Sequence, residues 1–95
     1  MIPDSVPLEI LSLYEIKERE PLEYRKSKDN VFARYTDAKG FITCAVSGFK
    51  SQMRIDFQID HITPMSKGGL TTIENLQVLS RKAHTEKTRL ENLKK

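Results

Sequence analysis

The chain has 95 residues, enough for one small domain with a limited core. Hydrophobic residues make up 38% of it and charged residues 31%, a balance typical of a soluble globular protein. No apolar run approaches the length of a membrane span, so we expect neither a transmembrane helix nor a signal peptide. The single cysteine excludes an intramolecular disulfide framework and favours a reducing compartment, which we expect to be the cytoplasm.

Charge is unevenly distributed along the chain. Residues 1–20 carry two basic and five acidic side chains, a net charge of −3, whereas residues 81–95 carry six basic and two acidic side chains, a net charge of +4. A basic C-terminal end fits a polyanionic partner such as nucleic acid. The plain alternative is a solvated helix face, and charge alone favours that alternative.

Two helices are predicted before residue 40. The first spans about residues 6–20, with Asp4 or Ser5 as its N-cap, and Pro21 ends it. The second spans about residues 22–35. Its apolar residues recur at helical spacing, at Tyr24, Val31, Phe32 and Tyr35.

Two short strands follow, over residues 41–46 and 54–60, and their pattern fits a half-buried antiparallel hairpin. In the second strand, apolar and polar side chains alternate strictly up to Asp60. Continued alternation would send Asp60 and His61 to opposite faces of the strand. A site shared by both residues therefore requires the strand to break there, and Pro64 makes such a break compatible with the sequence.

The last part of the chain reads as a loop, a strand and a helix. Gly68 and Gly69 supply a flexible turn, and Thr71-x-x-Glu74 is a capping-box pattern for one helical turn. The apolar run over residues 76–79 predicts a buried strand. Ser80 stands where an N-cap is required, so a helix is expected from there to about Leu93.

The residues with recognisable chemistry gather in one stretch, residues 57–87, which reads FQIDHITPMSKGGLTTIENLQVLSRKAHTEK and contains both histidines of the chain. Singly, Asp60-His61 reads as a surface pair, Asn75 as a turn residue and His84 as a helix-surface histidine. Together, in this order and context, they resemble the HNH nuclease family. The resemblance covers roughly the last two-thirds of the chain, including the residues that lead into the motif.

The resemblance implies a role for each residue of the motif. His61 would be the general base that deprotonates water, and Asp60 and His84 would be the metal ligands. Asn75 would pin the loop and orient the base; in some members a residue near this position instead helps to hold the metal. The cofactor would be one divalent cation, Mg²⁺ or Mn²⁺ first and Ni²⁺, Co²⁺ or Zn²⁺ as alternatives. The basic residues expected to face phosphate are Arg81, Lys82, Lys87 and Arg89.

The chain departs from many family members at a structural zinc site. These members carry two Cys-x-x-Cys pairs, and the matching positions here are Cys44, Ser47, Ser80 and Ala83. One thiolate cannot build a tetrahedral zinc site of useful affinity. We therefore expect no structural zinc, and we expect Cys44 to be a small buried hydrophobic residue.

The resulting hypothesis is an α+β fold, with a ββα-metal core over residues 41–95 preceded by a helical segment over residues 1–40 that packs on it. The expected function is a metal-dependent DNA endonuclease that hydrolyses phosphodiester bonds with one metal, nicks DNA and leaves 5′-phosphate and 3′-hydroxyl ends. The alternative is a non-catalytic nucleic-acid-binding module on the same fold. The expected partner is DNA, not a membrane, and the chain is expected to act as a monomer or homodimer, alone or in a larger assembly. Sequence preference and biological role (homing, restriction, phage packaging or defence) stay open.

Overall fold

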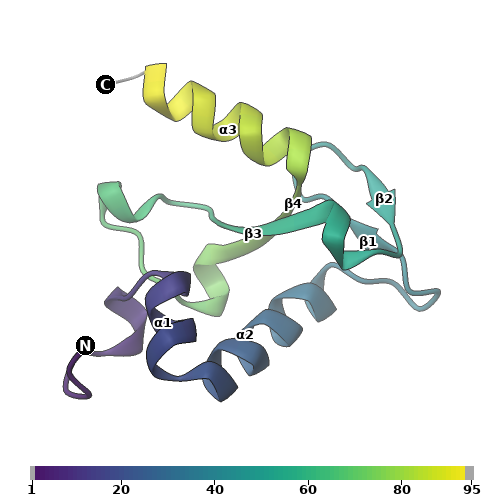
Figure 1. Cartoon of the computed structure of the whole chain (residues 1–95). Helices are drawn as coiled ribbons and strands as arrows, with labels where there is room; N and C mark the ends of the chain where they lie inside the picture. The colour runs from purple at the N-terminus through teal and green to yellow at the C-terminus, as the bar shows by residue number, and fades with distance from the viewer. Residues whose placement is uncertain (1, 94–95) are drawn as a thin grey trace.

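The computed structural model describes residues 2–93, and within this range the α+β prediction is confirmed. Residues 2–93 form three α-helices and two small antiparallel sheets of two strands each. The strands β3 (Phe57–His61) and β4 (Leu76–Ser80) lie between α3 (Arg81–Leu93) on one side and the two N-terminal helices on the other (Figure 1). No helix among residues 2–93 is long and apolar enough to cross a membrane.

The predicted first helix is wrong in its extent. Residues Leu8–Ile10 form a 3₁₀ turn, and α1 covers only Leu13–Arg19. The reason is a capping box at Ser12: its hydroxyl accepts a hydrogen bond from the backbone N–H of Glu15 at 3.1 Å, and the Glu15 carboxylate accepts one from the Ser12 N–H at 2.9 Å. The N-cap is therefore Ser12, and not Asp4 or Ser5.

The second helix is confirmed, because α2 covers Pro21–Arg34 and differs from the prediction by one residue at each end. Proline suits the first turn of a helix, since its missing N–H would have no partner there. Val31 and Phe32 of α2 are buried against the strands. The rest of this core consists of Ile42, Cys44, Phe57, Leu76, Val78 and Leu79, so the prediction that Cys44 is buried is confirmed.

The predicted strand pairing is wrong. Only residues Ile42–Thr43 (β1) of the first expected strand are extended, and they pair with β2 (Lys50–Ser51). Residues Arg54–Asp56 form a 3₁₀ turn, which leaves Ile55 68% exposed, and β3 begins only at Phe57. Its partner is β4, every residue of which is buried, so the prediction of a buried strand at residues 76–79 is confirmed.

Of the two predictions for the residues that flank β4, one is confirmed and one is wrong. The helix after β4 is confirmed, and the Ala83 N–H donates to Ser80 Oγ at 3.1 Å, as expected of an N-cap. The capping box at Thr71 is wrong: the 3₁₀ turn Ile73–Asn75 follows Thr72 instead. The Thr71 hydroxyl makes long-range hydrogen bonds that replace the local ones.

Gly69 lies where two parts of the loop between β3 and β4 approach each other closely. A Cβ atom at this position would stand 1.8 Å from the Thr63 carbonyl oxygen and 3.0 Å from Asn75 Nδ2. Gly68 differs, because its φ of +87° favours glycine but a Cβ atom there would meet nothing within 4 Å.

We therefore expect Gly69→Ala to lower the free energy of unfolding by about 3 kcal/mol, because the backbone must move to relieve the clash. Gly68→Ala is the matched control, with an expected cost of about 1 kcal/mol from backbone strain alone. Chemical denaturation of both variants measures the difference. Equal stability of the two variants would contradict the close approach at Gly69.

Candidate metal and nuclease site

Asp60 lies at the centre of a polar cluster between β3–β4 and α3. We call this the β3–α3 cluster; its members are Asp60, Gln77, His84, Lys87 and Glu91. The Asp60 side chain is only 11% exposed. Its Oδ2 atom accepts hydrogen bonds from Gln77 Nε2 at 3.0 Å and from Lys87 Nζ, which lies 3.1 Å away. Its Oδ1 atom instead faces His84 Nε2 at 3.8 Å.

The Asp60 carboxylate and the His84 imidazole fit a shared divalent cation. Metal–ligand bonds to carboxylate oxygen and imidazole nitrogen are about 2.1 Å long, so two such bonds span the 3.8 Å between Oδ1 and Nε2. Gln77 holds the carboxylate from the other side and fixes its orientation. Among residues 2–93 no group of three or more His, Cys, Asp and Glu side chains could hold a metal. Two protein ligands would leave the remaining positions to phosphate and water, as a catalytic site requires.

The Lys87 ammonium belongs to the same cluster. Besides Asp60, it lies 2.7 Å from Glu91 Oε2 and donates to the His61 carbonyl oxygen at 3.0 Å. Burial disfavours its charge, but the hydrogen bonds to Glu91 and Asp60 outweigh burial and raise the pKa of Lys87 above its ordinary value of 10.5. Lys87 thus provides positive charge beside Asp60 and bridges the two neighbouring positions of β3.

His61 lies on the other face of β3. The strand is regular to its end, with Asp60 opposite Gln77 and His61 opposite Leu76, so the two side chains leave the strand in opposite directions. The break that a site on one face would require is absent from β3, so the structure does not bring His61 onto the same face as Asp60 and His84. His61 Nε2 lies 2.8 Å from Thr71 Oγ1. Burial lowers the pKa of His61 below 6.5, the ammonium of Lys87 adds to this, and the carboxylate of Asp60 opposes it.

Asn75 holds the loop between β3 and β4 closed. Its Oδ1 atom accepts a hydrogen bond from the Thr63 N–H at 2.9 Å, and its Nδ2 atom donates to the carbonyl oxygens of Thr63 at 3.1 Å and Leu70 at 2.8 Å. Its own carbonyl oxygen accepts from the Ile62 N–H at 2.8 Å. One of these four bonds holds Ile62, the residue after His61, and the other three hold Thr63 and Leu70, so Asn75 lies where it can orient the histidine through the backbone.

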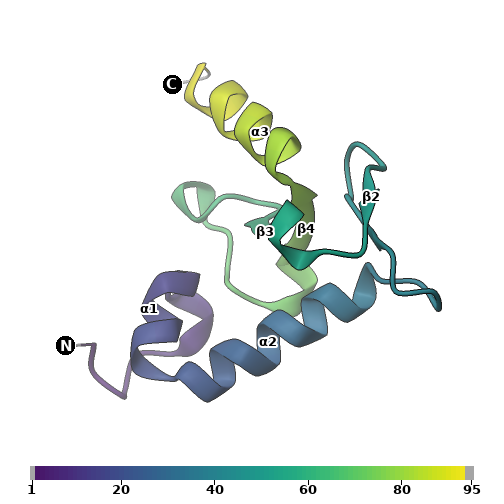
Figure 2. The same cartoon turned by 45° about the vertical axis from the view of Figure 1, so that its right-hand side comes forward.

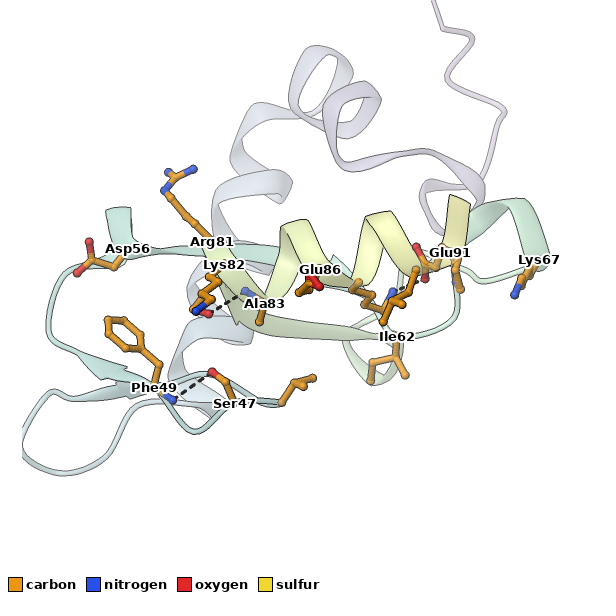
Figure 3. A pocket seen from close by; sticks show the side chains of 15 residues that line it. Ser47, Phe49, Asp56, Ile62, Lys67, Arg81, Lys82, Ala83, Glu86 and Glu91 are labelled. Atoms are coloured by element: carbon orange, nitrogen blue, oxygen red, sulfur yellow. Dashed lines mark hydrogen bonds and ion pairs between the residues drawn. The ribbon is translucent and has the colours of Figure 1, made fainter. Parts of the chain in front are cut away.

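Of the other basic residues of α3, Arg81 and Lys82 line a groove beside the helix, and Arg89 is not part of its lining. Arg81 donates to the Ile55 carbonyl oxygen at 2.6 Å, Arg89 pairs with Glu86 at 2.9 Å, and Lys82 is exposed. The groove has a volume of about 970 Å³, and Figure 3 shows Arg81 and Lys82 across it from Ser47 and Phe49. Figure 2 shows that α3 projects away from the rest of the fold beyond β4.

Three residues of the site region were not identified from the sequence. Gln77 reaches Asp60 because β4 is the partner of β3, and this pairing was not predicted. Glu91 follows Lys87 by one helical turn, a spacing that could have indicated the ion pair. Thr71 reaches His61 across ten residues, and its capping-box pattern concealed this contact.

One protein-family model matches the region of the chain that contains these residues. The family model described as HNH endonuclease matches residues 43–90, just over half of the chain. The match spans β3, β4 and most of α3, and thus every residue proposed above as a metal ligand or base. No curated protein and no solved structure matches the chain. The chain therefore belongs to the HNH endonuclease family.

Proposed function

We propose that this protein is a metal-dependent DNA endonuclease that hydrolyses one phosphodiester bond at a time. The observation that carries the proposal is that the two oxygen atoms of the Asp60 carboxylate have different partners. Oδ2 accepts hydrogen bonds from Gln77 and Lys87, whereas Oδ1 faces His84 Nε2 at 3.8 Å. Asp60 on β3 and His84 on α3 point toward one place. This arrangement is better explained by a shared cation than by packing of the two elements. Asp60 and His84 are the ligands, and Mg²⁺ or Mn²⁺ are the ions of first choice.

The bound cation would supply positive charge that stabilises the extra negative charge of the phosphate in the transition state. In this proposal His61 takes the proton from the attacking water. Because His61 and Asp60 leave β3 on opposite faces, the proposal requires that water to lie at the end of the strand, within reach of both the cation and the His61 ring. Its lowered pKa keeps the imidazole neutral, and therefore able to accept a proton, near neutral pH. Lys87, which contacts both Asp60 and the backbone of His61, adds charge stabilisation between the two faces of β3.

DNA would approach along α3, where Arg81, Lys82 and Arg89 can contact phosphates. Phosphate contacts of this kind produce binding that weakens steeply with salt and depends little on sequence. A single site cuts one strand, because the two strands of a duplex need oppositely oriented sites.

Supercoiled plasmid tests this proposal directly. With Mg²⁺ or Mn²⁺ we expect conversion to open circle, and with a chelator we expect no conversion. An Asp60→Asn/His84→Ala double variant, purified identically, controls for contaminating nucleases. Plasmid binding without cleavage in any divalent ion would instead support a nucleic-acid-binding module on the HNH fold.

Lys87→Met is expected to strengthen Mn²⁺ binding by about tenfold, or about 1.4 kcal/mol. The ammonium and the cation are both positive and share the Asp60 carboxylate, so removal of the ammonium lowers the repulsion that the cation meets. Lys82→Met is the matched control, since it removes the same charge from an exposed position on α3. Calorimetric titration with Mn²⁺ measures both. Equal tightening in the two variants would mean that net charge, and not the contact with Asp60, determines the affinity.

A further inference from the structure

We infer that Thr71 is a positioning residue that sets the tautomer of His61, so that Nε2 carries the ring hydrogen and Nδ1 is the atom that accepts the proton from water. This inference rests on the proposed function of His61 as the general base. It assigns a part in catalysis to a threonine outside the Asp-His, Asn and His positions of the motif. It also assigns one to the N-terminal segment, which lies outside the residues that the family model matches.

The number of hydrogens available fixes the direction of both contacts of the Thr71 hydroxyl. The Thr71 hydroxyl has one hydrogen and lies 2.5 Å from the Leu11 carbonyl oxygen and 2.8 Å from His61 Nε2. A carbonyl oxygen can only accept, so the hydroxyl must donate its hydrogen to Leu11. The hydroxyl can then only accept from His61, which requires a hydrogen on Nε2. In the neutral ring this leaves the lone pair on Nδ1.

Thr71 is itself held by the backbone of the N-terminal segment. Its N–H donates to the Glu9 carbonyl oxygen at 2.6 Å, so its N–H and its hydroxyl are both bound at the end of the first 3₁₀ turn. Leu11 is 5% exposed, and Arg19 secures the preceding residues through hydrogen bonds to the carbonyl oxygens of Pro3 and Val6. The acceptor that selects the tautomer is therefore fixed by the fold and does not depend on solvent.

The alternative tautomer would be poorly accommodated. With the hydrogen on Nδ1, the Nε2 lone pair would face a hydroxyl whose hydrogen is already donated to Leu11, and the two lone pairs would repel. The Thr71 hydroxyl would have to leave the Leu11 carbonyl to restore the contact, and a partly buried carbonyl would lose its partner. Thr71 thus fixes the ring orientation and the tautomer of His61. Carboxylates and carbonyl groups have the same effect on histidines that bind metals.

Thr71→Val removes the hydroxyl and keeps the shape of the side chain. We expect kcat to fall about 10- to 100-fold, the range for loss of an orienting partner, with KM for DNA and Mn²⁺ affinity unchanged. Thr71→Ser keeps the hydroxyl, so the kcat of this variant is expected to equal that of the wild type. Thr72→Val is the matched control, because Thr72 makes no side-chain cap hydrogen bond within the described residues.

The tautomer is measured separately, by ¹⁵N chemical shifts of the His61 ring in the metal-free protein. We expect a protonated Nε2 and an unprotonated Nδ1 in the neutral wild-type ring, and a mixture of tautomers in Thr71→Val. A wild-type ring with the hydrogen on Nδ1, or a Thr71→Val variant with wild-type kcat in a protein that cleaves, would overturn the inference. If the shifts are as expected but the wild type cleaves nothing, the proposed function fails and the assignment of the tautomer stands.

Discussion

His61→Ala is expected to slow DNA cleavage by about 10²- to 10⁴-fold, the range for loss of a general base, and to leave Mn²⁺ binding intact. The reason is the geometry of β3. His61 leaves the strand on the face opposite Asp60, and its ring contacts Thr71 and not the β3–α3 cluster. The proposed base and the proposed metal ligands can therefore be removed independently, although Asp60 and His61 are neighbours in the chain.

A cleavage time course beside a calorimetric Mn²⁺ titration of the same preparation tests this separation. Thr72→Val serves as a control from the same region that leaves the His61 ring and its partner in place. If His61→Ala lost metal affinity as well as activity, His61 would be a ligand and the proposed roles would be wrong. If it cleaved at the wild-type rate, another group would be the base.

His84→Ala is expected to weaken Mn²⁺ binding by at least 100-fold and to raise the metal concentration needed for cleavage by the same factor. Loss of a residue that only orients a ligand costs about 10- to 100-fold in affinity, and His84 is proposed as a ligand itself. The fold should tolerate the change, because the His84 side chain is 32% exposed. Saturating Mn²⁺ should recover much of the rate, since His61 is untouched.

Thr85→Ala is the matched control for this variant, because Thr85 is the exposed neighbour of His84 on α3. Its metal affinity and rate should equal those of the wild type. Retention of wild-type Mn²⁺ affinity by His84→Ala would remove the imidazole from the metal site and leave Asp60 as the only ligand of the pair.

The elements that the sequence predicted well depend on local signals. Pro21 ends the first helix, Ser80 caps α3, and the apolar run between Asn75 and Ser80 forms β4; each signal acts within a few residues. The composition of the motif was also sufficient to identify the family that the comparison confirmed.

The features that the sequence did not predict depend on distant partners. Alternation in residues 54–60 indicated a strand but could not say which strand it pairs with, and the choice of β4 brings Gln77 to Asp60. Thr71 satisfied the local pattern of a helix cap, yet its hydroxyl contacts Leu11, 60 residues away in the chain. Hydrogen bonds that close such long loops leave no periodic trace in the sequence.

The metal dependence of cleavage, compared with the metal dependence of binding, tests the central claim most directly. Mn²⁺ is titrated into the wild type and into Asp60→Asn, and cleavage of supercoiled plasmid is measured at each concentration. The proposed site predicts that the midpoints for binding and cleavage coincide in the wild type and move together to higher Mn²⁺ in Asp60→Asn. Cleavage whose midpoint is the same in both proteins, while binding weakens in Asp60→Asn, would show that the cation held by Asp60 is not the one that supports the reaction.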